Sequence, residues 1–134
     1  MKTILITGAT SGLGLMLSRH YDAKGYNLIT VGRDNKKLNN LKRQVSKKNK
    51  INSFAFDFNK KKNYQKFLKI LENYKKKIDV IIHCVGGGFG LHNPLINHED
   101  LNFLFNINVA TAAGINKIIL EKKKYNKDLK IIHI

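Results

Sequence analysis

The segment that most constrains this fold is a glycine-rich stretch near the N-terminus, residues 7–14, with the sequence TGATSGLG. It directly follows a short β-branched run, Thr3–Thr7. After it, Leu13, Leu17 and Tyr21 fall at helical spacing on one apolar face. A strand that passes through glycines straight into a helix is typical of a parallel α/β sheet. The sequence therefore predicts a strand, a tight turn and a helix at the start of the chain.

The rest of the chain continues to alternate between strand-like and helical patterns. Further strands are expected at 26–31, 51–58, 78–85 and 129–134. Helices are expected after the N-cap Asp34, around 64–71, and from about Asn97 to Lys124. The run 78–85 is almost entirely apolar, which is typical of a parallel strand buried on both faces. Five strands and four helices in strict alternation predict an α/β fold with a doubly wound parallel sheet, the Rossmann fold.

Length and composition limit this fold to one domain, residues 1–134, with 43% hydrophobic residues. The apolar stretch Ile4 to Ile6 is too short for a signal-peptide core or a membrane span, so we expect a cytoplasmic protein without a membrane partner. The only cysteine, Cys84, cannot form an internal disulfide and is expected to be a packed strand residue. We predict no metal ligands.

The net charge of +16 raises the alternative of a basic nucleic-acid binder. However, the lysines are spread over the polar positions of the expected helices and are not gathered on one face. No stacking aromatic residues accompany the basic runs, and no nucleic-acid-binding motif occurs. We therefore expect a solvated basic surface and no nucleic-acid partner.

The glycine-rich turn is also suited to binding a phosphate. Glycine lets the backbone approach a pyrophosphate closely, and the first amides of the following helix favour a negative charge. The spacing of Gly8, Gly12 and Gly14 is TGxxxGxG and differs from the common GxGxxG. This pattern resembles the single-domain reductases of the short-chain dehydrogenase/reductase family, whereas the extended members would have glycine in place of Ser11. The predicted cofactor-binding residues of the turn are Gly8, Thr10, Ser11, Gly12, Leu13 and Gly14.

The resemblance covers the whole chain and implies roles for three further residues. Asp57 matches the acidic residue that holds the adenine ring, and it could cap the following helix, a role compatible with the first. Gly86 is the only residue kept from the family's Asn-Asn-Ala-Gly segment, which here reads HCVG, so we expect His83 to be structural. Asn108 matches the catalytic asparagine that holds a water in the proton relay, although asparagine is common in this chain and the match could be chance.

The choice of nicotinamide cofactor depends on the residues after the second expected strand. Arg33 matches the arginine of relatives that use NADP, and Gly32 stands where relatives that use NAD have an acidic residue. A guanidinium binds a phosphate through paired, charge-assisted hydrogen bonds. We therefore predict NADP as the cofactor and consider NAD the weaker alternative. Arg33 could also be an ordinary surface charge.

The family's catalytic tyrosine and lysine are missing from these residues. The resemblance implies hydride transfer to or from a small carbonyl or alcohol substrate. In the family, the tyrosine of a Tyr-x-x-x-Lys pair is the acid/base, the lysine raises its acidity, and a serine after the fifth strand polarises the carbonyl. None of the five tyrosines is followed by lysine four residues later, and the fifth strand, with His133 expected to be structural, ends at Ile134. We expect an N-terminal part of a longer family domain that is inactive alone.

This incomplete pattern bears on the sheet, the stability and the assembly of the chain. The sheet should be incomplete at its C-terminal side, with the fifth strand as an unpaired edge, and the isolated chain should be marginally stable. The leading alternative is an inactive nucleotide-binding remnant, or a subunit that another chain completes. For a full-length protein the resemblance implies a homo-oligomer formed through the helix that carries Asn108.

Overall fold

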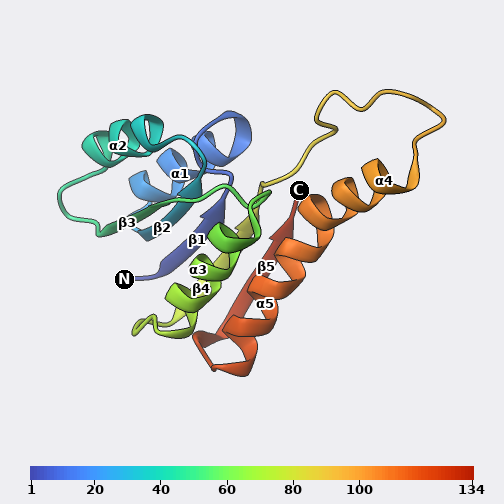
Figure 1. Cartoon of the computed structure of the whole chain (residues 1–134). Coiled ribbons are helices and arrows are strands. Elements are labelled where there is room, and N and C mark those ends of the chain that lie inside the picture. The colour runs from blue at the N-terminus through green and yellow to red at the C-terminus, as the bar shows by residue number, and fades with distance from the viewer.

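The computed structural model describes all 134 residues and contains one five-stranded, fully parallel sheet (Figure 1). The strands lie in the order β3-β2-β1-β4-β5. The chain moves outward from β1 to β2 and β3, then returns to the other side of β1 for β4 and β5. This reversal places a topological switch point between β1 and β4. The strands are β1 (Thr3–Thr7), β2 (Asn27–Gly32), β3 (Ile51–Ala55), β4 (Ile78–His83) and β5 (Tyr125–His133).

Helices cover both faces of this sheet, which confirms the predicted doubly wound fold. The helices are α1 (Gly12–Ala23), α2 (Asn35–Gln44), α3 (Lys61–Glu72), α4 (His98–Phe105) and α5 (Thr111–Glu121), with the π-helical segment η1 (Asn106–Ala110) joining the last two. One hydrophobic cluster packs α3 and α5 against the sheet through Phe67, Ile115 and Ile119. On the opposite face, Leu17 and Tyr21 of α1 pack against a second cluster.

Most of the predicted elements are confirmed, with differences at their ends. The carboxylate of Asp34 caps α2 by accepting a hydrogen bond from the backbone N–H of Lys37 at 3.0 Å. β3 and β4 end two or three residues earlier than their apolar runs, at Ala55 and His83. The chain leaves the sheet there, and the residues that follow each strand line a pocket instead. β5 begins earlier than expected, at Tyr125.

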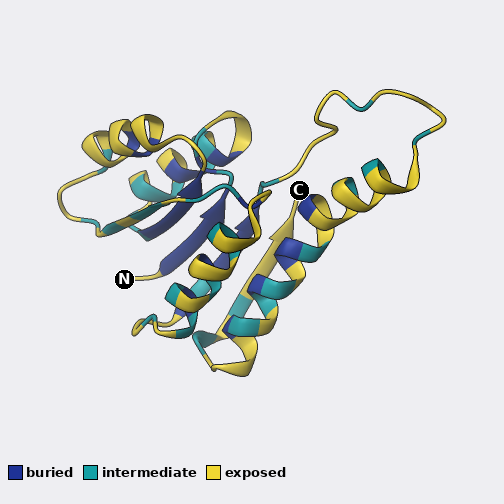
Figure 2. Ribbon diagram, viewed as in Figure 1, coloured by how far each residue is buried: buried dark blue, intermediate teal, exposed yellow.

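The long helix extends from His98 to Glu121 and differs between its two ends. Figure 2 shows α5 with buried positions against the sheet, whereas α4 has no buried residue, is mostly exposed and projects from the body. With 24 residues and a mean hydropathy of 1.4, this helix could cross a membrane by length and composition alone. The core helix of a soluble protein meets the same criteria, and Ile107, Ile115 and Ile119 are buried in the core. The length and hydropathy of this helix are therefore weak evidence for a membrane span.

Candidate nucleotide-binding site

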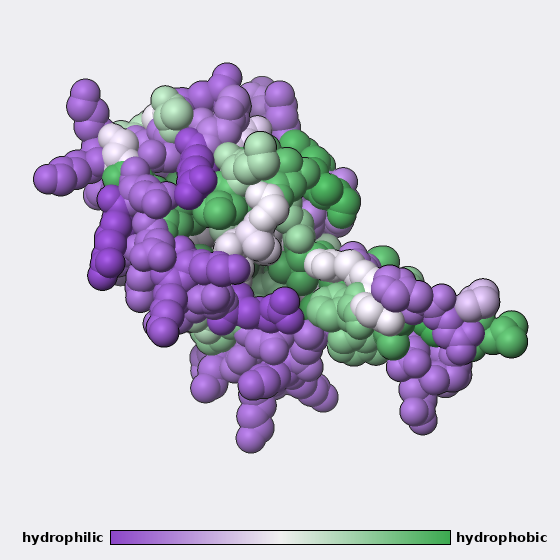
Figure 3. Space-filling view, turned by 90° about the horizontal axis from the view of Figure 1, so that it is seen from above, coloured by the Kyte–Doolittle hydropathy of each residue, from purple (hydrophilic) through white to green (hydrophobic).

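A pocket of about 260 Å³ opens at the carboxyl ends of the strands, beside the switch point between β1 and β4. Figure 3 looks down on this edge and shows hydrophobic and near-neutral surface in the middle, with hydrophilic surface beside it. Open α/β sheets bind their ligands in this crevice. The pocket brings together all nine residues that were predicted to bind a cofactor: Gly8, Thr10, Ser11, Gly12, Leu13, Gly14, Arg33, Asp57 and Gly86.

Close backbone packing explains two of the three glycines of the turn. Gly8 has φ +68°, and a Cβ there would lie 2.6 Å from the carbonyl oxygen of Cys84. A Cβ at Gly14 would collide with the carbonyl oxygen of Gly8. The Thr7 hydroxyl oxygen accepts a hydrogen bond from the backbone N–H of Cys84 at 3.1 Å, which ties the turn to the end of β4. The turn therefore presents bare backbone to the pocket.

The N-terminus of α1 can receive an anion at this turn. Ser11 is the N-cap residue, but its side chain makes no capping hydrogen bond. The first amides of α1 consequently have no side-chain partner, and the helix dipole places partial positive charge there. Together with the bare glycine backbone, this arrangement fits a pyrophosphate group.

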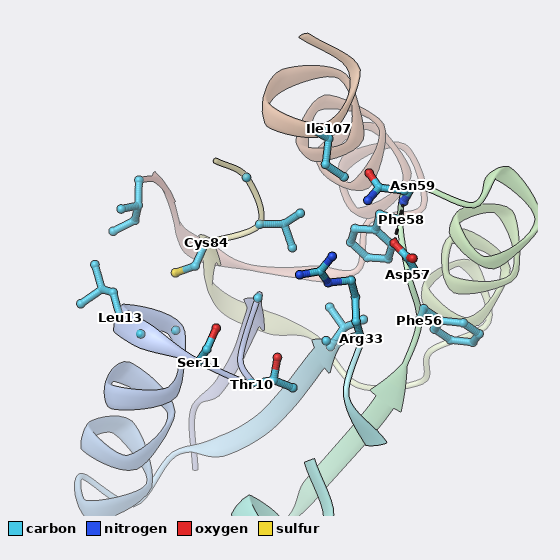
Figure 4. Close-up of a pocket in the computed structure, with 18 of the residues that line it drawn as sticks. Thr10, Ser11, Leu13, Arg33, Phe56, Asp57, Phe58, Asn59, Cys84 and Ile107 are labelled. Atoms are coloured by element: carbon cyan, nitrogen blue, oxygen red, sulfur yellow. Dashed lines mark hydrogen bonds between the residues drawn. The ribbon is translucent and has the colours of Figure 1, made fainter. Parts of the chain in front are cut away.

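Arg33 and Asp57 form one end of the pocket, after β2 and β3. Figure 4 shows the Arg33 guanidinium pointing into the middle of the pocket, with Thr10 and Ser11 on one side and Asp57 on the other. Arg33 forms no ion pair, since the two salt bridges of the structure join Lys117 to Glu121 and Lys122 to Glu72. Phe58 adds an apolar surface beside Asp57 (Figure 4). An adenosine with a phosphate on its ribose would find a cation, a carboxylate and an aromatic surface here.

The alternative role of Asp57 as the cap of the next helix is wrong. Its Oδ1 accepts a hydrogen bond from the backbone N–H of Asn59 at 3.0 Å, in a local turn. The N-cap residue of α3 is Lys60, which makes no side-chain capping bond. Asp57 precedes this N-cap residue, and its second carboxylate oxygen, which makes no hydrogen bond, remains available to the pocket.

Asn108 lies outside the pocket lining, on the π-helical segment η1. Its Oδ1 accepts a hydrogen bond from the backbone N–H of Gly87 at 2.8 Å, and its Nδ2 donates to the Gly87 carbonyl at 3.1 Å. Nδ2 also donates to the Leu104 carbonyl at 2.9 Å. A Cβ at Gly86 would collide with Asn108 Oδ1. Asn108 therefore clamps the loop after β4, and its catalytic role stays a prediction.

His83 is a satisfied structural residue, as predicted. It is buried at the end of β4, and its Nε2 lies 2.8 Å from Oδ1 of Asn116 on α5. Its ring stacks on that of His133 with centroids 4.8 Å apart, and Asn116 Nδ2 lies 3.4 Å from His133 Nε2. Burial lowers the pKa of His83, so the neutral imidazole is favoured.

The expectation for Cys84 is wrong in one respect. β4 ends at His83, so Cys84 is no longer a strand residue, and its half-buried side chain lines the pocket. Burial raises the pKa of its thiol, which favours the unreactive protonated form. Sequence reasoning also missed several apolar residues that line the pocket, most of them in the segments after the strands: Val31, Phe56, Phe58, Val85, Phe89, Ile107 and Ile134.

No tyrosine lines this pocket. Tyr64, for example, donates a hydrogen bond to the Thr111 carbonyl at 2.8 Å, and burial raises its pKa. Tyr74 accepts one from the Asn52 amide at 2.8 Å, far along the chain from the glycine turn. The pocket can therefore hold a nucleotide, but these residues place no phenol there as a proton donor.

Known proteins are similar to this chain in sequence and in fold. A very-long-chain 3-oxoacyl-CoA reductase of Phaeosphaeria nodorum is 38% identical over 123 residues, which are 86% of this chain and 36% of that protein. A bulky-bulky ketone specific alcohol dehydrogenase from Comamonas testosteroni has a similar structure, with a TM-score of 0.80 and 22% identity over 91% of this chain and 49% of that one.

A short-chain dehydrogenase from Sphingobium yanoikuyae in complex with NADPH also has this fold, with a TM-score of 0.73 and 20% identity over 91% of this chain and 48% of that one. The chain therefore spans less than half the length of each of these three relatives. The family model described as short chain dehydrogenase matches this chain over residues 2–134, nearly its full length. This chain belongs to the short-chain dehydrogenase family of oxidoreductases.

Proposed function

We propose that the chain binds NADP in the pocket at the carboxyl edge of the sheet. The adenosine would lie between Arg33 and Asp57, and the pyrophosphate would lie on the turn that ends at Gly14. The nicotinamide half would then extend across the switch point toward the loop after β4. The name of the similar Sphingobium protein, a complex with NADPH, supports this cofactor class.

The observation that carries this proposal is the unpaired guanidinium of Arg33 inside the pocket. A ribose phosphate would neutralise it through paired hydrogen bonds. NAD carries a hydroxyl at that position and would leave the charge unmatched. Gly32 lies next to it, where an acidic side chain would repel the phosphate, and a Cβ at Gly32 would collide with Thr10.

When bound, the cofactor supplies a hydride that moves between its nicotinamide ring and the carbon of a carbonyl or alcohol. The chain's own residues bind and orient it: the turn holds the pyrophosphate, and Asn108 holds the loop after β4 through Gly87. We propose a small carbonyl or alcohol substrate and a cytoplasmic location. No tyrosine of the chain lines the pocket, so we propose that these 134 residues bind the cofactor without turnover unless another polypeptide supplies the proton donor.

Isothermal titration calorimetry of the chain with NADPH and with NADH tests this proposal. We expect NADPH to bind about tenfold or more tightly than NADH because of the charged hydrogen bonds to its phosphate. Arg33→Ala should remove this preference and leave NADH affinity nearly unchanged. Arg43→Ala, which removes an exposed arginine of α2 outside the pocket, is the matched control. Equal binding of both cofactors by the unmodified chain would overturn the assignment of NADP.

A further inference from the structure

The loop after β4 contains a backbone conformation that does not suit its residue. Phe89 has φ +52°, in the left-handed region that favours glycine and asparagine. The backbone N–H of Leu91 donates to the Gly88 carbonyl at 2.9 Å, and Gly90 has φ +75°. Phe89 and Gly90 are therefore the two central residues of a turn with positive φ at both positions, where a bulky side chain is unfavourable. The turn itself needs no phenyl group there.

Two contacts hold this turn in place. Asn108 makes two hydrogen bonds to the backbone of Gly87, two residues before Phe89. The Phe89 ring packs edge-on against Phe103 of α4, with centroids 5.2 Å apart and planes at 80°. α4 has no buried residue, so this contact is not part of the hydrophobic core. The ring of the strained residue is instead held against the exposed helix α4.

The contact with Phe103 holds Phe89 at the pocket. Phe89 lines the pocket together with Val85 and Gly86 of the same loop, yet 40% of its surface stays exposed. Arg33 marks the adenosine side of the pocket beyond β2, and Phe89 follows β4, on the opposite side of the switch point. A dinucleotide that lies across a switch point places its second nucleoside on that side.

We propose that Phe89 closes the nicotinamide end of the pocket and packs against the nicotinamide ring, and that Phe103 is a positioning residue that holds the phenyl ring there. This inference rests on the proposed binding of NADP. Strained residues persist where a function requires them, and a contact with a flat aromatic ring accounts for a phenyl group in a glycine-like conformation. The ring would also exclude water from the carbon that exchanges the hydride.

The test compares NADPH with adenosine 2',5'-bisphosphate, which lacks the nicotinamide half. Both ligands are titrated calorimetrically into the unmodified chain and into Phe89→Gly. Glycine relieves the positive φ, so the variant should melt at the same or a higher temperature. We expect NADPH affinity to fall about tenfold, the size of one lost aromatic contact, with the bisphosphate unaffected.

Two further variants separate positioning from general packing. Phe103→Ala should weaken NADPH binding by about threefold without changing bisphosphate binding, and Phe103→Tyr, which keeps the ring, should restore it. The matched control is Leu95→Ala, because Leu95 is 85% exposed in the same loop and does not line the pocket. It should leave the affinity for both ligands unchanged.

The outcomes distinguish this inference from the function on which it rests. If the unmodified chain binds both ligands and Phe89→Gly weakens neither, or weakens both equally, the role of Phe89 is overturned and NADP binding stands. If the unmodified chain binds neither ligand, the proposed function fails and this inference fails with it.

Discussion

β1 and β5 are strands of the same parallel sheet, but they lie in very different surroundings. Every residue of β1 is buried between two neighbouring strands and two layers of helices. No residue of β5 is buried, and its outer edge has no partner strand (Figure 2). The residues that form the candidate nucleotide site are attached mainly to the buried strands. The proposed nucleotide binding therefore depends on the well-packed half of the molecule, whereas the exposed half adds the loop after β4 and the long helix.

The largest expected difference between the two strands is in the cost of truncating a side chain. Leu5→Ala in β1 should lower the free energy of unfolding by about 2–5 kcal/mol, because it opens a cavity in a fully buried site. Ile132→Ala in β5 should cost about 1 kcal/mol or less, since Ile132 is 38% exposed. Urea denaturation measures both. Similar losses would show that β5 is packed more tightly than the structure indicates.

A second prediction concerns the glycine turn that β1 carries. Gly8→Ala should destabilise the chain by about 1–2 kcal/mol, because alanine is strained at φ +68°, and should also displace the end of β4. NADPH binding should be lost as well. Gly88→Ala is the matched control, since a Cβ there meets nothing within 4 Å and its φ is not in the left-handed region. Retained NADPH binding in Gly8→Ala would contradict the proposed contact of this turn with the pyrophosphate.

The stacked His83 and His133 rings join the two halves and predict a pH dependence. Burial lowers the pKa of folded His83 below its ordinary value of 6.5, so the unfolded chain binds the proton first as the pH falls. This contribution to stability is complete above pH 6.5 and is lost as the pH falls from there through the lowered folded pKa. Melting temperatures between pH 7 and 5 measure it.

His83→Gln should make the melting temperature less sensitive to pH in that range. His92→Gln, in the exposed loop, is the control and should leave the pH dependence unchanged. An identical slope in His83→Gln and the unmodified chain would show that His83 does not contribute to it.

The smallest effect on stability is expected at the exposed edge. Ile132→Lys should change the free energy of unfolding by about 0.5 kcal/mol or less, but a charged side chain on an edge strand opposes pairing between molecules. Light scattering during storage should therefore rise more slowly in this variant. Unchanged aggregation would show that the edge of β5 is not the surface that associates. The expected marginal stability of the chain stays a prediction, and a cooperative melt well above ambient temperature would contradict it.

Much of the fold and site followed from local patterns in the sequence. The alternation of apolar runs and helical faces predicted the sheet, and Asp34 was identified as a cap from its position alone. The nine predicted cofactor-binding residues meet in one pocket because each follows a strand of a parallel sheet, and such strands all end at one edge. Strand ends were less predictable, since apolar residues such as Phe58 continue past the strand to line the pocket.

The sequence by itself determined the fold, the glycine turn and the charge beside it, because these depend on residues close together along the chain. The tertiary structure alone decided that Asn108 clamps Gly87, that Phe89 meets Phe103, and that Cys84 faces the pocket. Each of these depends on how separate strands, loops and helices meet after folding. Neither periodicity nor a motif records the direction in which a side chain points across such a junction, and packing decides it.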